Sequence, residues 1–414
     1  MILPENAPFT LSFRAEEGFQ AASGGDPPAL SLRYDGGRIS ITLFYDADPR
    51  PLSLSGKVLS GEVCELRAAS YRLTLSSGGR VLDEEWPFGT PLFAGKELVS
   101  SHPLSLVPGV PEEREAPETR FTGAEGWRPG GGVFVGDCMP YAAGGRYHVL
   151  YLKDRRHHKS KWGKGAHQWE HISSADLREW TVHSTAVPID DAREGSICTG
   201  SFLEKDGVSY LFYTVRTVDG SPAPIRRSLS PDGLHFRKDP GFSFTISDRY
   251  RASSARDPKV FRGGDGAYHM LLTTTLLSEG KGCLLHLVSD DLDAWREVGP
   301  LYLAPGEDEP ECPDLFTFGD YTYLVFSLQG VGQYRFTRTP LSGWILPPDP
   351  VIPCESVPKA AVFQGKILFA GFHRERGYAG TMTFRRAVAK EDGTLVFLQD
   401  AGVARYRGEI ADEA

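Results

Sequence analysis

Residues 139–152 read MPYAAGGRYHVLYL, a short strand, a glycine turn and a second strand that an aromatic residue opens. The pattern returns as GSFLEKDGVSYLFYTV at 200–215, DPKVFRGGDGAYHMLLTT at 257–274, PDLFTFGDYTYLVFSL at 313–328 and AAVFQGKILFAGF at 360–372. Repeats of this kind and spacing are typical of propeller blades built from four strands with variable loops. The five copies therefore predict an all-β chain that contains a five-bladed β-propeller.

The sequence before these repeats has a pattern that predicts a second β-structure. Glycine and proline, with 46 and 30 copies among 414 residues, favour turns over helices. Residues 1–110 alternate apolar and polar residues in short runs, as in LSLRYDGGRISITLFY at 30–45, which is typical of hairpins. The Pro- and Glu-rich stretch VPGVPEEREAPETRF at 107–121 suits neither a strand nor a long helix. We therefore predict an N-terminal β-sandwich at 1–110, a linker at 111–126 and a propeller at 127–414.

Charge and cysteine content narrow the range of partners. A formal net charge of -9 disfavours nucleic acid and anionic membrane surfaces. The first residues lack a basic, apolar leader, and no window approaches the ~18 apolar residues of a membrane span, so we expect a cytoplasmic protein. The six scattered cysteines suggest free thiols, and we expect no metal and no cofactor. The oligomeric state is left open.

Three acids recur at equivalent places in the repeats. In a propeller the first strand of each blade lines the central axis, so polar residues where these strands begin converge. Asp137, Asp257 and Glu311 stand there in the first, third and fourth copies. Acids brought so close together repel one another, so their presence suggests a function that needs them. Glycoside hydrolysis is such a function, because it needs an ionised carboxylate near the anomeric carbon and a protonated acid near the leaving oxygen. We expect Arg256 to hold Asp257 ionised.

The order of these elements resembles a known family. Asp137, TGS at 199–201, ARDP at 255–258 and ECPD at 311–314 follow the order and approximate spacing of glycoside hydrolase family 32, the invertase and levanase family of β-fructofuranosidases. The segment WGKGAHQWEHISSADLREW at 162–180 is similar to the first-blade region of that family. The resemblance covers about residues 127–375.

The resemblance implies roles that the residues alone do not assign. It makes Asp137 the nucleophile, Asp257 the stabiliser of the transition state and Glu311 the general acid and base. It also implies an aromatic wall and a set of hydroxyl contacts for the sugar, for which the candidates are Trp162, His167, Ser201 and Arg256. Lys359, at the start of the fifth first strand, is a further candidate for substrate binding.

Two departures from the family pattern leave the substrate open. The first family motif is Asn-Asp-Pro-Asn, whereas Gly136, Cys138 and Met139 surround Asp137 here. The family usually carries a sandwich after the propeller, whereas this chain has one in front. We expect a retaining hydrolase of terminal furanosides, with β-fructofuranosides as the first substrate class. The alternatives are an arabinofuranosidase or galactofuranosidase, and a carbohydrate-binding propeller without catalysis.

One basic segment is peculiar to this chain. KDRRHHKSKWGKG at 153–165 carries four lysines, two arginines and two histidines close to the expected rim of the site. Such a loop could bind a phosphorylated or carboxylated substrate, and Arg155 and Arg156 are the residues to test.

Overall fold

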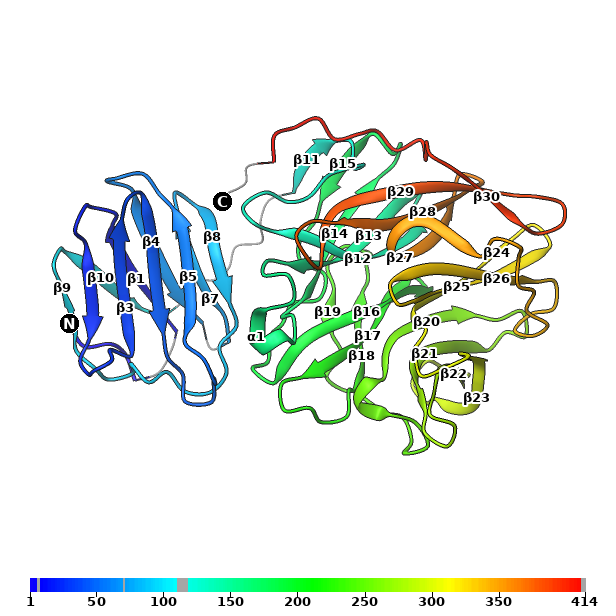
Figure 1. Ribbon diagram of the computed structural model, residues 1–414, viewed down its shortest axis with the longest axis horizontal. Helices are drawn as coiled ribbons and strands as arrows, with labels where there is room; N and C mark the ends of the chain where they lie inside the picture. The colour runs from blue at the N-terminus through cyan, green and yellow to red at the C-terminus, as the bar shows by residue number, and fades with distance from the viewer. Residues whose placement is uncertain (6–7, 70, 110–117, 411–414) are drawn as a thin grey trace.

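The computed structural model describes residues 1–5, 8–69, 71–109 and 118–410, and β-strands dominate it (Figure 1). Its two named helical segments are one turn each, α1 (Ser160–Gly163) and the 3-10 turn Ala252–Ser254. Within the described residues, no helix has the length and apolar character needed to span a membrane. The all-β prediction is confirmed.

Two sheets of five strands form the N-terminal part. One sheet has the strand order β10-β1-β6-β7-β8, and the other has the order β5-β4-β3-β2-β9. Alternate residues of these strands are buried in one core that both sheets line. The strands of the first sheet are β1 (Phe9–Arg14), β6 (Val63–Ala68), β7 (Leu73–Ser77), β8 (Arg80–Glu85) and β10 (Leu104–Pro108). Those of the second are β2 (Gln20–Ser23), β3 (Leu30–Asp35), β4 (Arg38–Leu43), β5 (Leu52–Lys57) and β9 (Leu98–Ser100).

Five inner strands form the centre of the remaining chain. Each contacts the next, and the fifth contacts the first, so the strands close into a ring. They are β12 (Phe134–Ala143), β16 (Glu194–Lys205), β20 (Arg256–Arg262), β24 (Glu311–Phe318) and β27 (Val351–Phe363). Each pairs antiparallel with the following strand, namely β13 (Arg146–Asp154), β17 (Val208–Thr217), β21 (Tyr268–Leu276), β25 (Tyr321–Leu328) and β28 (Lys366–Arg374). These are the five hairpins predicted from the repeats, arranged as a propeller.

Further strands complete the blades on the outside. They are β14 (Gln168–Ser174), β15 (Glu179–Val182), β18 (Ile225–Ser230), β19 (Arg237–Lys238), β22 (Lys281–Ser289), β23 (Arg296–Leu303), β26 (Val331–Thr337), β29 (Gly380–Ala389) and β30 (Leu395–Leu398). The structure differs from the sequence prediction at β11 (Thr119–Thr122), which lies inside the predicted linker yet pairs with β15. The reason is Phe121, whose ring stacks on Trp127 at 4.3 Å and so anchors this segment to the first blade. Residues 110–117, which include the first part of that linker, lie outside the described residues, and the division into two domains stays a prediction.

Every inner strand bulges at the same height. The register slips between Val135 and Cys138 in β12, and equivalent slips occur in β16, β20, β24 and β27. A bulge inserts an extra residue and re-aims its side chain. Asp257 and Cys312, which lie in two of these bulges, have φ angles of 59° and 51°. The bulges therefore determine which residues of the inner strands reach the centre.

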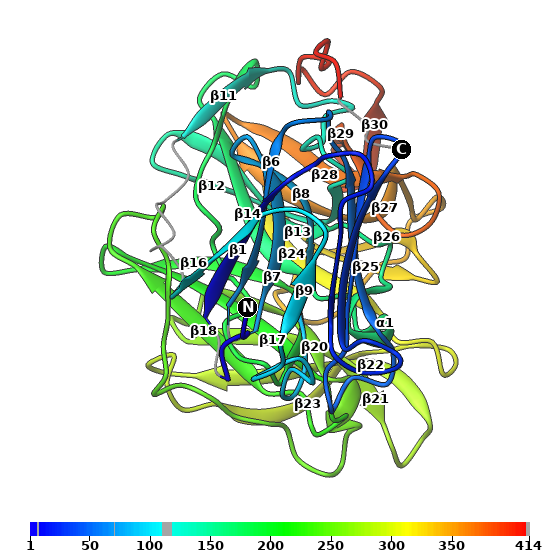
Figure 2. The same ribbon diagram turned by 90° about the vertical axis from the view of Figure 1, so that its left-hand side faces the viewer.

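The N-terminal sheets lie beside the first blade. In Figure 1 strand β8 faces α1 and the neighbouring loop, and Figure 2 shows the two sheets in front of the propeller when the molecule is viewed from that side. Phe88, just after β8, packs edge-on against Trp162 with ring centroids 5.9 Å apart. The sandwich and the propeller thus meet at the loop between β13 and β14.

Candidate active site

The three predicted acids share one cavity. Asp137, Asp257 and Glu311 all line a hollow of about 430 Å³, which also receives residues from the first, second and fifth blades. A larger, more open hollow of about 960 Å³ lies on the N-terminal sheets, and its lining contains none of these acids. A cavity with convergent carboxylates is the better candidate for chemistry.

Asp137 is fixed by hydrogen bonds to both carboxylate oxygens. Thr199 Oγ1 donates to Oδ2 at 2.8 Å, and the Tyr378 hydroxyl donates to Oδ1 at 3.0 Å. The Cys312 thiol donates to Oδ2 at 3.4 Å. Burial raises the pKa of that thiol well above its usual value, so it remains a neutral donor. The Asp137 carboxylate is consequently held in one orientation toward the cavity.

Asp257 lies deeper, and its environment changes its acidity. Its side chain is only 5% exposed, and it accepts a hydrogen bond from the Cys312 backbone amide at 3.0 Å. Burial raises the pKa of Asp257 to about 6, against the opposing effect of the Arg256 guanidinium 3.7 Å away. The expectation that Arg256 holds Asp257 ionised is correct only above that pH, because desolvation exceeds the attraction.

This raised pKa predicts a pH-dependent gain in stability for Asp257→Asn. In the unfolded chain Asp ionises near pH 4, so the folded protein loses stability as pH rises from about 4 to 6. A rise of the pKa from 3.8 to about 6 corresponds to about 3 kcal/mol above pH 6. The variant is expected to melt at a higher temperature than the parent at pH 7.5, with a smaller difference at pH 4.5. Equal differences at both pH values, measured by calorimetry, would contradict the raised pKa.

Glu311 is partly exposed, unlike Asp257. Its side chain is 40% exposed, and Arg256 donates to Oε1 at 3.0 Å. The same guanidinium also bonds Glu309, a residue that the sequence reasoning missed although it lies two positions before Glu311. Ser254 and Thr275 donate to Glu309 as well. Arg256 therefore links Glu309 to Glu311 and lies beside Asp257, so its guanidinium contacts acids of the cluster.

The predicted sugar contacts divide into two groups. His167 and Arg256 line the cavity, as expected. Ser201 instead ties β16 to β20, because its hydroxyl donates to the Pro258 carbonyl and accepts from the Val260 amide, both at 2.8 Å. Buried Lys359 donates to the Gly200 carbonyl at 2.8 Å and counters the charge of Asp314. Ser201 and Lys359 are thus placed in contacts between strands and are absent from the lining of the cavity.

Three other candidates of the first-blade loop are placed outside the lining of the cavity. Trp162 packs on Phe88 of the N-terminal part. Arg155 and Arg156 bind carboxylates of β8. These carboxylates lie about 70 residues earlier in the chain, and no local pattern reveals the pairing.

Tyr378 is the main residue that sequence reasoning missed. It lies in the turn between β28 and β29 and reaches Asp137 across 241 positions of sequence. Burial, with the Asp137 charge, raises the pKa of its phenol well above the usual value, so the hydroxyl is a proton donor. A Cβ at position 136 would lie 2.5 Å from that hydroxyl. Gly136, which departs from the family's first motif, thus provides the space that Tyr378 occupies.

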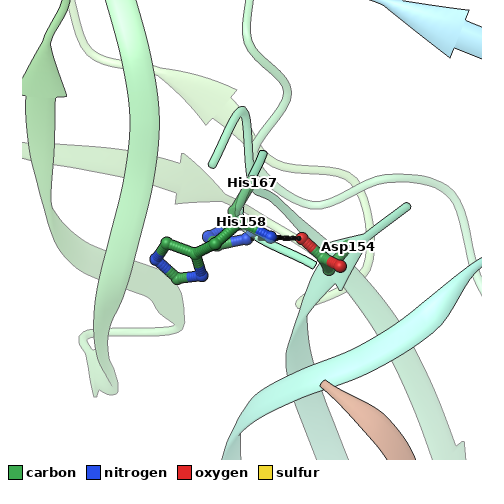
Figure 3. A group of neighbouring side chains, drawn as sticks. All are labelled: Asp154, His158 and His167. Carbon is green, nitrogen blue, oxygen red and sulfur yellow. Dashed lines mark hydrogen bonds and ion pairs between the residues drawn. The ribbon is translucent and has the colours of Figure 1, made fainter. Parts of the chain in front are cut away.

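A group of three side chains adjoins Asp137. The ligand-type atoms of Asp154, His158 and His167 lie within 4.8 Å of one another, an arrangement that could hold a metal ion. Figure 3 shows the hydrogen bond that joins His167 Nε2 to Asp154 Oδ1, at 2.9 Å. Asp154 also accepts the backbone amides of His157 and His158, at 2.6 and 3.0 Å. Because these three donors already engage both oxygens, the carboxylate acts here as the anchor of a loop.

Comparisons with known proteins identify a family that resembles this chain. Residues 139–342 match the family model described as the glycosyl hydrolases family 32 N-terminal domain. The chain is 32% identical over 215 residues to sucrose-6-phosphate hydrolase from Bacillus subtilis, an alignment that covers 48% of this chain and 44% of the relative. It is 30% identical over 210 residues to raffinose invertase from Escherichia coli, covering 48% and 42%. The alignments thus span less than half of each relative.

Solved structures show the same fold at low sequence identity. Fructan 1-exohydrolase IIa from Cichorium intybus superposes with a TM-score of 0.55 at 17% identity, covering 68% of this chain and 60% of that one. Sucrose-6-phosphate hydrolase from Lactobacillus gasseri gives 0.53 at 20% identity, covering 66% and 62%.

Proposed function

The chain belongs to glycosyl hydrolase family 32 through residues 139–342, and from this premise we propose that it is a retaining hydrolase of terminal β-fructofuranosides. The observation that carries the proposal is the shared cavity, in which an oriented Asp137 and a partly exposed Glu311 lie together with buried Asp257. The names of the matched relatives, a sucrose-6-phosphate hydrolase and a raffinose invertase, support fructosides as the substrate class.

The proposed first step forms a covalent intermediate. An Asp137 oxygen attacks the anomeric carbon while the bond from that carbon to the leaving oxygen breaks, and Glu311 gives its proton to the departing alcohol. The fixed orientation of Asp137 suits the nucleophile, because attack requires alignment with the breaking bond. The exposure of Glu311 suits a residue that meets leaving groups of different size and later water.

The second step releases the sugar with retained configuration. Glu311, now ionised, takes a proton from water, whose oxygen attacks the anomeric carbon and breaks the ester to Asp137. Asp257 would accept hydrogen bonds from sugar hydroxyls, and these bonds would strengthen as positive charge develops on the ring. Arg256 would hold Glu311 in place through both steps.

A panel of substrates tests this function. Sucrose, sucrose phosphate, fructo-oligosaccharides and levan, with arabinofuranosides and galactofuranosides alongside, are incubated with the protein and with Asp137→Asn, and free monosaccharide is measured. The proposal requires fructose release that the variant abolishes. Release from another furanoside alone would replace the substrate class, and binding without any release would support a carbohydrate-binding propeller. The cytoplasmic location stays a prediction, to be tested by cell fractionation.

The contact between Tyr378 and Asp137 gives a specific expectation for Tyr378→Phe. This change removes one hydroxyl and leaves Asp137 with Thr199 and Cys312 as side-chain donors. A hydrogen bond to a charged group contributes about 1.5–3 kcal/mol, so kcat should fall about 10- to 100-fold. KM should change little, since the hydroxyl is already bound to Asp137 in the free protein. A large change in KM with unchanged kcat would instead make Tyr378 a substrate contact.

A further inference from the structure

Strand β8 of the sandwich ends in three consecutive buried acids, Asp83, Glu84 and Glu85, which face the first blade. Glu84 is fully buried, and Lys153 Nζ lies 2.6 Å and Arg155 Nε 3.3 Å from its Oε1. Burial opposes ionisation of Glu84, but these two cations and Arg72 hold its pKa well below the usual range. Breaking such a buried group of charges is costly, because it leaves a charge without a partner.

Arg156 extends this contact to the other two acids. Its guanidinium lies 2.8 Å from Asp83 and 3.0 Å from Glu85, and it also donates to the Ser53 carbonyl at 2.9 Å. Arg155 donates to the Leu82 carbonyl at 3.3 Å. Both strands that carry these partners, β5 and β8, belong to the sandwich. We call the contacts of Lys153, Arg155 and Arg156 with the acids of β8 the β8 clamp.

The segment that carries the clamp cations continues directly into the lining of the active-site cavity. Asp154 lies between the clamp residues, and its carboxylate accepts the amides of His157 and His158. Both histidines have positive φ angles, 49° and 70°, a conformation that costs energy without such support. Figure 3 shows His158 and His167 on the same side of Asp154. His158 of this turn, and His167, which bonds Asp154, both line the cavity with Asp137.

The histidines of this region contact Tyr378, whose hydroxyl is hydrogen-bonded to Asp137. His157 Nδ1 donates to the Tyr378 carbonyl at 2.7 Å. The His158 ring stands edge-on to the Tyr378 ring with centroids 4.2 Å apart, and the His167 ring lies 5.1 Å away. Contacts therefore run without a gap from β8 through the loop to the hydroxyl that orients Asp137.

We propose that the N-terminal sandwich is a working part of the active site, in which the β8 clamp positions Tyr378 against the carboxylate of Asp137. The proposal deepens the proposed function, because it rests on Asp137 as the reacting group. Asp83, Glu84, Glu85 and the three clamp cations are positioning residues in this account, since they touch neither substrate nor reacting atoms. It gives the sandwich in front of the propeller a catalytic purpose besides stability.

The test is a double-mutant cycle with a matched control. Arg156→Gln removes the cation between Asp83 and Glu85, and Arg33→Gln removes an exposed cation paired with Asp35 at 2.9 Å on the same sandwich. Small displacements of positioned groups cost up to about 10²-fold in rate. We expect Arg156→Gln to lower kcat about tenfold in the parent but less than about twofold when Tyr378 is already Phe, with KM nearly constant. Arg33→Gln should leave kcat unchanged in both backgrounds.

Equal losses in the two backgrounds, or no loss in the parent, would overturn the proposal. A second readout separates it from the proposed function. Hydrogen exchange followed by mass spectrometry should show faster exchange in Arg156→Gln for the peptides that contain His157 and Tyr378, and none of this in Arg33→Gln. Unchanged exchange at Tyr378 would refute the clamp even if the protein hydrolysed fructosides, and a protein without hydrolytic activity would refute the function while exchange still reported on the clamp. If Arg156→Gln folds poorly, Arg156→Lys serves in its place, since it keeps the charge but not the two-sided contact.

Discussion

Asp137→Asn is expected to lower kcat about 10⁴-fold while leaving the fold intact. The amide is nearly isosteric with the carboxylate, and its oxygen can still accept from Thr199 or Tyr378. It cannot form the ester with the anomeric carbon, so the covalent route is closed and only binding and the remaining polar groups act on the substrate. The measurement is steady-state hydrolysis of sucrose and of a fructo-oligosaccharide.

Two controls make this result specific. Asp35→Asn removes an exposed carboxylate on the sandwich and should leave kcat unchanged. Melting temperatures of both variants should stay near that of the parent, which separates loss of chemistry from loss of folded protein. Substantial activity in Asp137→Asn would show that another group attacks the sugar.

Glu311→Gln should produce a loss that depends on the leaving group. Without a proton donor, kcat for sucrose is expected to fall about 10²- to 10⁴-fold, the usual range for general acid catalysis. An aryl fructofuranoside whose phenolate leaves without protonation should regain much of the rate of the first step. Hydrolysis of the intermediate should remain slow, because the same residue activates the water.

A burst of aryl alcohol followed by slow turnover is therefore the expected time course for Glu311→Gln. The glutamine oxygen can still accept from Arg256, so the guanidinium keeps a partner at this position. Equal losses with sucrose and with the aryl substrate would contradict the acid role, and would leave Glu311 as a residue that only binds Arg256.

The fold could be predicted because its signal is local and repeated. Each hairpin contains both of its strands and its turn within about 20 residues, so alternation and turn residues suffice to identify it. Asp137, Asp257 and Glu311 could be found because each stands near the start of an inner strand, although they occupy three different positions around the bulge. The physical reason for that place, the bulge in each inner strand, was not visible in the sequence, since bulges depend on pairing with the neighbouring strand.

The structure departs from the expected contacts where the decisive partner is distant in sequence. Ser201 bonds the backbone of neighbouring β20, and Lys359 of β27 bonds the Gly200 carbonyl of β16, which is not next to β27 in the ring. Arg155 and Arg156 carry charge near the site, yet buried acids of β8 bind them. Tyr378 lies in a hairpin turn with no motif around it, and only the fold brings it to Asp137. Gly136 was the one available signal for Tyr378, because it stands where the family has a larger side chain and so leaves space for another group.

Identification of the covalent intermediate shows directly which residue attacks the sugar. Glu311→Gln is mixed with an activated aryl fructofuranoside, quenched during the slow phase, digested and analysed by mass spectrometry. We expect one fructosyl group on the peptide from β12, attached to Asp137, and no such adduct in the double variant that also carries Asp137→Asn. A fructosyl group on another residue, or complete turnover of the substrate without any adduct, would contradict this expectation.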